Sequence, residues 1–194
     1  MTQTYDCKRD YGSPFSFDAQ PSAEEMARKL VGPGISIVEG SVVLKQAGAQ
    51  SSIFYGASTV FGDDDMEEGV VLTTGNVHEP ICKTNQDPGT SFAQKSRAPG
   101  DRDLQQECIK SGIVKNCGAM FDTVSLEFDF ETKSKTTMNI KYVFASEEYP
   151  EFVQNLFADS FAFFVDGENI ALTEDGIAVP RCTTVREKEP GAQL

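Results

Sequence analysis

The chain has 194 residues, 39% of them hydrophobic, which is enough apolar material for one sizeable folded domain. Its 17 basic and 30 acidic side chains give a formal net charge of −13 at pH 7 (17 − 30 = −13). This charge disfavours nucleic acid and anionic membrane surfaces as partners and favours cations or basic partners, unless it serves only solubility. No apolar run approaches the ~20 residues that span a bilayer, so direct membrane insertion is not expected.

The cysteine content leaves two redox states open. The five cysteines, none of them in a Cys-x-x-Cys pair, are Cys7, Cys82, Cys108, Cys117 and Cys182. Because the single histidine, His78, has no cysteine at zinc-finger spacing, a structural zinc site is poorly supported. In a cytosolic protein all five thiols would be reduced. In a secreted protein, which we favour, one or two disulfides are expected in the polar middle of the chain.

The N-terminal part predicts an irregular arm over residues 1–20, followed by one helix. Ser22 is a good N-cap, and Glu25 three residues later completes a capping box. Gly32 and Pro33 predict the end of the helix. Apolar residues recur at helical spacing between these signals and predict a single buried stripe, made of Ala23, Met26, Ala27, Leu30 and Val31.

After the helix, the sequence predicts mainly strands. Residues 35–38 and 42–44 flank a Glu-Gly-Ser turn and predict a hairpin, while residues 52–55 and 70–74 predict two more strands. Apolar and polar residues alternate over residues 124–130, which is typical of a strand with one buried face.

Two further apolar segments and a turn extend the strand pattern toward the C-terminus. Residues 138–144 alternate before becoming wholly apolar, and residues 161–165 are apolar on both faces, as in a central strand. Asp166-Gly167 is a hairpin turn signal that leads into a returning strand at residues 169–172.

Residues 76–120 form a long polar region that is rich in proline and glycine and is expected to be a loop. A short helical turn over residues 104–109 is predicted within it, with Asp101 or Asp103 as its cap. We therefore predict a mainly β fold, an antiparallel β-sandwich or jelly-roll-like domain with one N-terminal α-helix. This domain covers residues 21–179, and residues 180–194 form a charged tail expected to be extended or disordered.

Acidic residues gather beside three of the predicted elements, and they suggest a calcium site. Calcium takes six to eight oxygen ligands in loose geometry, which loops at strand ends can supply. The candidate ligands are Asp101, Asp103, Glu147, Glu148 and Asp159. The alternative is that Asp101 or Asp103 only caps a helix and that the glutamates are solvated. The acidic run over residues 63–65 is a weaker rival cation site.

Catalytic arrangements are poorly supported by the sequence. Glu147 and Glu148 are a carboxylate pair of the kind that glycoside hydrolases use, but neighbouring residues of a strand point to opposite faces. His78 would have to serve any histidine-dependent hydrolase alone, and no Gly-x-Ser-x-Gly motif occurs. We therefore expect that the chain is not an enzyme.

Several blocks resemble, in order, those of the choice-of-anchor L domain, a family of predicted surface and secreted proteins. Residues 144–152, which read Phe-Ala-Ser-Glu-Glu-Tyr-Pro-Glu-Phe, are similar to the family signature almost letter for letter. The other matching blocks, spread over roughly residues 22–175, are residues 30–35, 68–77, 100–104, 124–130, 159–165 and 169–171. Two departures are Ala158-Asp159, where the family has Asn-Asp, and the end of the chain at Leu194, before the further strands of family members.

The resemblance implies an extracellular or cell-surface, non-catalytic adhesion or structural module, although no signal peptide is visible in this chain. Expected partners are an extracellular protein or a glycan, with calcium as a possible stabilising ion. One alternative is a carbohydrate-binding or glycoside-cleaving domain. Another is an assembly subunit that pairs with a second chain through an acidic face or an open sheet edge.

Overall fold

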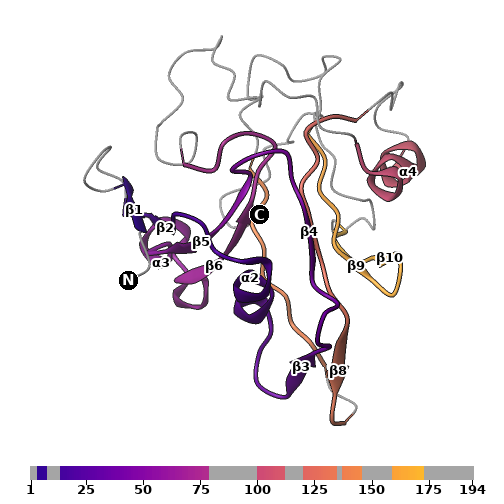
Figure 1. Ribbon diagram of the computed structural model, residues 1–194, viewed down its shortest axis with the longest axis horizontal. Coiled ribbons are helices and arrows are strands. Elements are labelled where there is room, and N and C mark those ends of the chain that lie inside the picture. The colour runs from indigo at the N-terminus through magenta and orange to yellow at the C-terminus, as the bar shows by residue number, and fades with distance from the viewer. Residues whose placement is uncertain are drawn as a thin grey trace, which may run out of the picture. The chain divides into compact units, whose positions relative to one another are not determined.

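The computed structural model describes residues 4–7, 14–78, 100–111, 120–134, 137–145 and 159–172 (Figure 1). The chain divides into two compact units. The first comprises Met1–Ala98 and Asp122–Lys141, and the second comprises Pro99–Phe121 and Tyr142–Leu194.

A four-stranded antiparallel sheet is the centre of the first unit. Its strands are β1 (Thr4–Asp6), β2 (Ser16–Asp18), β5 (Ser51–Tyr55) and β6 (Glu68–Leu72), in the order β1-β2-β5-β6. Two of them lie in residues 1–20, so the prediction of an irregular arm there is wrong. Phe15 and Phe17 explain the difference, because both rings are buried in the core and thereby fix the backbone around β2.

The core of this unit is small and rich in aromatic rings. Its buried members are Cys7, Phe15, Phe17, Ala57 and Val77, and the partly buried Phe54, Phe61 and Val71 pack against them. The Phe15 ring contacts the rings of Phe54 and Phe61 edge-on, with centroids 6.3 and 6.0 Å apart. Such edge-to-face pairs contribute beyond the apolar area that they bury.

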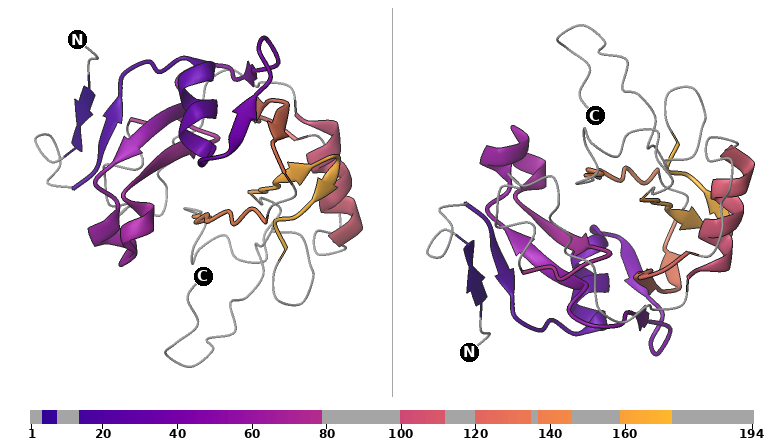
Figure 2. Two further views of the ribbon diagram at one scale, coloured as in Figure 1. Left: turned by 90° about the horizontal axis from the view of Figure 1, so that it is seen from below. Right: turned by 90° about the horizontal axis from the view of Figure 1, so that it is seen from above.

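The predicted N-terminal helix is confirmed as α2 (Ala23–Leu30). The Ser22 hydroxyl accepts a hydrogen bond from the Glu25 amide at 3.2 Å, and the Ser22 amide donates to the Glu25 carboxylate at 2.8 Å. The helix lies against β5 and β6 (Figure 2) and buries Met26 completely. Leu30, expected in the buried stripe, is 46% exposed, at the point where the helix ends and the chain becomes extended at Val31.

A two-stranded ribbon replaces the hairpin predicted for residues 35–44. Strand β3 (Ile35–Ile37) pairs with β8 (Phe130–Thr132), and β4 (Val43–Lys45) pairs with β7 (Ser125–Glu127), both antiparallel. The prediction that residues 35–38 and 42–44 pair with each other is therefore wrong. The Glu-Gly-Ser segment instead lies in a turn on one side of the ribbon, where the Ser41 amide donates to the Val38 carbonyl at 3.2 Å. The Ser41 hydroxyl also donates to the Val38 carbonyl and accepts from the Asp129 amide.

The described part of the second unit contains one helix and one hairpin. Helix α4 (Arg102–Ser111) is the predicted helical turn, longer than expected. Strands β9 (Phe164–Val165) and β10 (Glu168–Asn169) form the predicted hairpin, with positive φ angles at both turn residues, Asp166 and Gly167. Positive φ at both positions is the geometry of a type I′ turn, which Asp-Gly favours.

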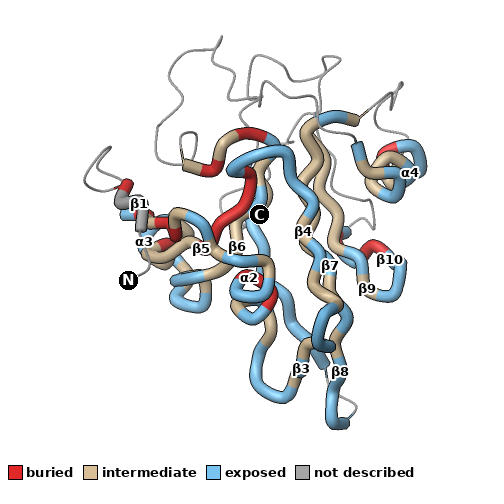
Figure 3. The backbone as a smooth tube through the Cα atoms, in the orientation of Figure 1, coloured by how far each residue is buried: buried red, intermediate tan, exposed pale blue. Residues whose placement is uncertain are grey.

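The mainly β prediction is confirmed, because the described strands form several antiparallel sheets; a sandwich or jelly roll stays a prediction. Two strand predictions are wrong. Residues 137–145 form no strand, and only Phe164 and Val165 of the segment 161–165 pair with another strand. Phe164 is 37% exposed, so this pair is not a central strand. The predicted tail at residues 180–194 lies outside the described residues (Figure 3).

Candidate functional site

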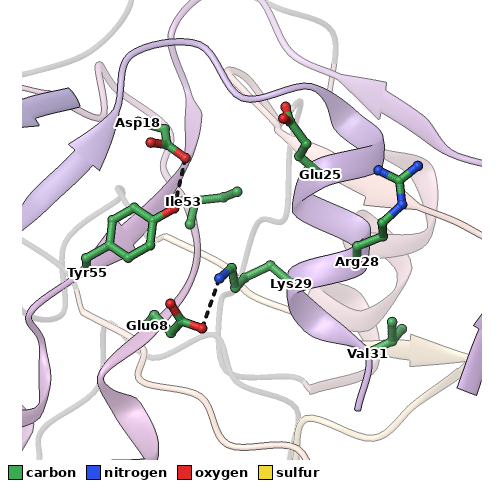
Figure 4. Close-up of a pocket in the computed structure, with 8 residues that line it drawn as sticks. All are labelled: Asp18, Glu25, Arg28, Lys29, Val31, Ile53, Tyr55 and Glu68. Atoms are coloured by element: carbon green, nitrogen blue, oxygen red, sulfur yellow. Dashed lines mark hydrogen bonds and ion pairs between the residues drawn. The ribbon is translucent and has the colours of Figure 1, made fainter. Parts of the chain in front are cut away.

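An open groove lies between helix α2 and strands β2, β5 and β6 of the first unit (Figure 4). Its volume is about 730 Å³, which is in the range of small-ligand sites. We call it the α2 groove. Its lining residues are Asp18, Glu25, Arg28, Lys29, Val31, Ile53, Tyr55 and Glu68.

Helix and strand periodicity place these side chains together. Glu25, Arg28 and Lys29 are spaced i, i+3 and i+4 and therefore share one face of α2. Ile53 and Tyr55 are two residues apart on β5 and therefore point to the same side of the sheet.

Two polar contacts order the groove. The Tyr55 hydroxyl donates a hydrogen bond to Asp18 Oδ2 at 3.0 Å. Lys29 Nζ lies 2.9 Å from Glu68 Oε1 and 5.5 Å from the centroid of the Tyr55 ring, so it forms an ion pair and a cation–π contact together. The groove thus already holds one ammonium group between a carboxylate and an aromatic face.

Two groups that line the groove, Tyr55 and Glu25, have shifted pKa values. Burial raises the pKa of Tyr55 to about 12, with further contributions from the hydrogen bond to Asp18 and from the negative charges of Asp18, Glu68 and Glu25. The hydrogen bonds from Ser22 lower the pKa of Glu25. At neutral pH Tyr55 is therefore protonated and Glu25 is ionised. This arrangement suits the binding of a cation better than proton transfer, which favours a group that titrates near the working pH.

The sequence analysis did not predict this groove, although the charged face of the helix was visible in the sequence. The charged face of α2 could be read from the spacing of Glu25, Arg28 and Lys29. Asp18, by contrast, lies in the segment expected to be an irregular arm, and nothing in the sequence pairs it with Tyr55.

The predicted calcium ligands lie elsewhere, and the structure describes three of the five. Asp101 caps helix α4, because its Oδ1 accepts hydrogen bonds from the amides of Asp103 at 2.9 Å and Leu104 at 3.0 Å. This is the capping role that the sequence left as the alternative. Asp103 is exposed in the first turn of the same helix, and Asp159 precedes β9 in the same unit.

Glu147 and Glu148 lie outside the described residues, so the calcium site as a whole stays a prediction. Within the described ranges, no group of three or more histidine, cysteine, aspartate or glutamate side chains is arranged to hold a metal ion.

The weaker rival cation site, the acidic run at residues 63–65, binds a cation of the chain itself. Lys141 Nζ lies 2.9 Å from Asp63 Oδ2 and 2.6 Å from Asp65 Oδ2. The hydrogen bond from Lys141 is the main reason why the pKa of Asp63 is lowered. The ammonium group thus provides a counter-charge for two of the three carboxylates of this run.

His78, the only histidine, is partly buried beside Phe17, with ring centroids 6.3 Å apart. Burial lowers the pKa of His78, opposed by a hydrogen bond to the Ala19 backbone. The imidazole is therefore neutral at pH 7.

The family model of the choice-of-anchor L domain matches residues 17–193, which include every lining residue of the α2 groove and most of the predicted charged tail. No curated protein and no solved structure matched the chain. In the part of the chain that the structure describes, no helix is long and apolar enough to cross a membrane. With 177 of its 194 residues matched (193 − 17 + 1 = 177), the chain belongs to the choice-of-anchor L domain family.

Proposed function

We propose that this chain is an extracellular, non-catalytic binding or structural module of a cell surface. The observation that carries the proposal is the family match over residues 17–193, because the name of the family suggests a surface-associated module. The formal charge of −13 agrees with a module that remains soluble while it presents a binding surface to cations or basic partners.

The cysteines support an oxidising location. Cys7 and Cys108 are buried, and we propose that both are members of disulfides. Disulfides persist in oxidising compartments and are rare where glutathione keeps thiols reduced. A secreted or surface location is therefore the setting that this cysteine chemistry favours.

The α2 groove supports binding rather than catalysis. Its phenol holds its proton up to high pH, and its lysine is engaged by Glu68. The phenol is therefore not poised to exchange a proton near pH 7. Binding of calcium by Asp101, Asp103, Glu147, Glu148 and Asp159 stays a separate hypothesis; a melting temperature that does not respond to millimolar calcium would end it.

The location is tested by labelling intact cells of the native host with a membrane-impermeant biotin reagent. The chain carries 17 lysine and arginine residues, and lysines exposed in the structure, such as Lys45, accept the reagent. We expect biotinylation of the protein before lysis, while a cytosolic marker stays unlabelled. Labelling only after lysis would contradict the proposed location.

A second candidate function is assembly with another copy, and one described feature favours it. Met138, Ile140, Tyr142 and Val143 are between 37% and 43% exposed in a segment without a strand partner. An exposed β-prone segment is a template for pairing with another chain. Sedimentation velocity at several concentrations tests this, and a monomer at all of them would count against assembly.

A further inference from the structure

The α2 groove contains a buried carboxylate without a counter-charge. Asp18 is only 7% exposed, and its carboxylate accepts a hydrogen bond from the Tyr55 hydroxyl, which is neutral. None of the ion pairs found among the described residues includes Asp18. Aspartate is rarely buried to this extent without a cation, because desolvation of the carboxylate must be offset by a charge or by several hydrogen bonds.

The two basic residues of the groove do not supply that charge. Lys29 is paired with Glu68 on the β6 side. Arg28 points away from Asp18 and Tyr55 (Figure 4). Asp18 and Glu25 lie on opposite sides of the upper part of the groove in this view, with Ile53 between them.

The shape of the groove selects the type of cation. A bare metal ion needs several ligands around one point, and the described acids of the groove are not arranged as such a group. An organic cation with several donors on an apolar stem can instead reach separate carboxylates. An arginine guanidinium has five N–H donors in a planar fork, and its aliphatic stem can cover apolar side chains.

We propose that the α2 groove binds an arginine side chain presented by a partner protein, with the guanidinium on Asp18 and the stem against Ile53 and Tyr55. Glu25 is the second acceptor, on the helix side of the groove. The contact of Lys29 with Tyr55, at 5.5 Å, shows that this aromatic face accepts a cation. This inference rests on the proposed function. It specifies the partner of the binding module as a protein with a basic segment, whose charge is complementary to that of the acidic chain.

The test uses the full chain and two short peptides, acetyl-Gly-Arg-Gly-amide and the same peptide with citrulline in place of arginine. Citrulline keeps the shape of arginine and removes the charge. Amide NMR shifts on a ¹⁵N-labelled protein report the site, and calorimetry reports the affinity. We expect saturable shifts in α2 and β5 with the arginine peptide, weaker at higher salt, and none with the citrulline peptide.

Three variants complete the test. Asp18→Asn and Glu25→Gln should each weaken arginine binding by roughly fivefold or more, since each removes one charged acceptor. Glu131→Gln, which removes an exposed carboxylate outside the groove lining, should leave binding unchanged. The Glu25 variant keeps an amide that can still serve the capping box, so α2 is expected to stay folded.

Three results would overturn the inference: no saturable shift, equal binding of the citrulline peptide, or an equal loss in Glu131→Gln, which would indicate unspecific charge attraction. These outcomes are distinct from a failure of the proposed function. Surface labelling of the cells together with no arginine binding would refute only the groove assignment, whereas arginine binding by a protein found only inside cells would refute the location.

Discussion

At the scale of single residues, Gln50 shows how one side chain joins three segments of the first unit. It is fully buried. Its Oε1 accepts a hydrogen bond from the Ala47 amide at 2.7 Å, and its Nε2 donates to the carbonyls of Thr74 at 3.2 Å and Asp122 at 2.8 Å. A buried amide that satisfies three backbone groups is specific for glutamine, since an apolar side chain of similar size offers none of these bonds.

Replacement of Gln50 by leucine should therefore destabilise the protein strongly. The variant leaves one N–H and two carbonyls, all beside a fully buried side chain, without the partner that they have now, and we expect a loss of about 3 kcal/mol in the free energy of unfolding. Urea denaturation measures it. The matched control is Gln20→Leu, since Gln20 is exposed and its replacement should cost less than about 1 kcal/mol. Equal losses in the two variants would show that the buried network contributes little.

His78 should make stability depend on pH below neutrality. Burial lowers the pKa of His78 in the folded state below its unfolded value of 6.5. As the pH falls below 6.5, the unfolded chain therefore binds a proton that the folded chain resists, and stability decreases. The stability contributed by the neutral ring is present above pH 6.5. We expect less loss between pH 7.5 and 5.5 in His78→Gln, and an NMR titration of the single histidine checks the pKa directly. A measured pKa at or above 6.5 would contradict this prediction.

At the scale of helices and strands, the sequence correctly predicted helix caps and a hairpin turn, which depend only on residues close together in the chain. The capping box of α2, the Asp101 cap of α4 and the type I′ turn of the β9–β10 hairpin each need only a few adjacent residues, and all three are present. The predicted hairpin was wrong because both of its strands pair with distant segments: β3 and β4 pair with residues between 80 and 97 positions away along the chain (125 − 45 = 80; 132 − 35 = 97). A turn sequence can favour a hairpin, but it cannot exclude a better partner elsewhere.

Two glycines of the first unit allow the cost of backbone strain to be compared with the cost of strain plus a steric clash. Gly34 and Gly56 both have positive φ angles, +89° and +79°, which cost any residue with a Cβ about 1–2 kcal/mol. A Cβ on Gly34 would meet open space, whereas one on Gly56 would lie 2.5 Å from the Pro14 carbonyl oxygen.

Gly34→Ala should therefore cost about 1 kcal/mol in the free energy of unfolding, and Gly56→Ala about 3 kcal/mol or more, because the second variant adds a steric clash to the strain. Thermal unfolding of the two variants beside the parent protein measures the difference. Similar losses in both variants would mean that the backbone at Pro14 moves away from residue 56 without an energetic cost.

At the scale of the whole molecule, the net charge of −13 should oppose folding through self-repulsion. Salt screens this repulsion, and at 0.1 M the screening length is about 10 Å. We expect the melting temperature at pH 7.5 to rise by roughly 2–5 °C between 20 and 300 mM sodium chloride. Near the isoelectric point of about 4.5 the salt effect should vanish. A decrease with salt at pH 7.5 would show that attractive ion pairs, such as that of Lys141 with Asp63, outweigh the repulsion.

The sequence by itself determined the mainly β character, the first helix with its cap, the hairpin turn and the family, because these depend on short-range periodicity, capping chemistry and a contiguous signature. Only the tertiary structure decided that Asp18 meets Tyr55, that Lys141 reaches Asp63, and that β3 pairs with β8. Each of these contacts joins residues between 37 and 97 positions apart (55 − 18 = 37; 132 − 35 = 97). Contacts at such separations depend on which surfaces the core buries together, and no local pattern of charges or apolar residues specifies that choice.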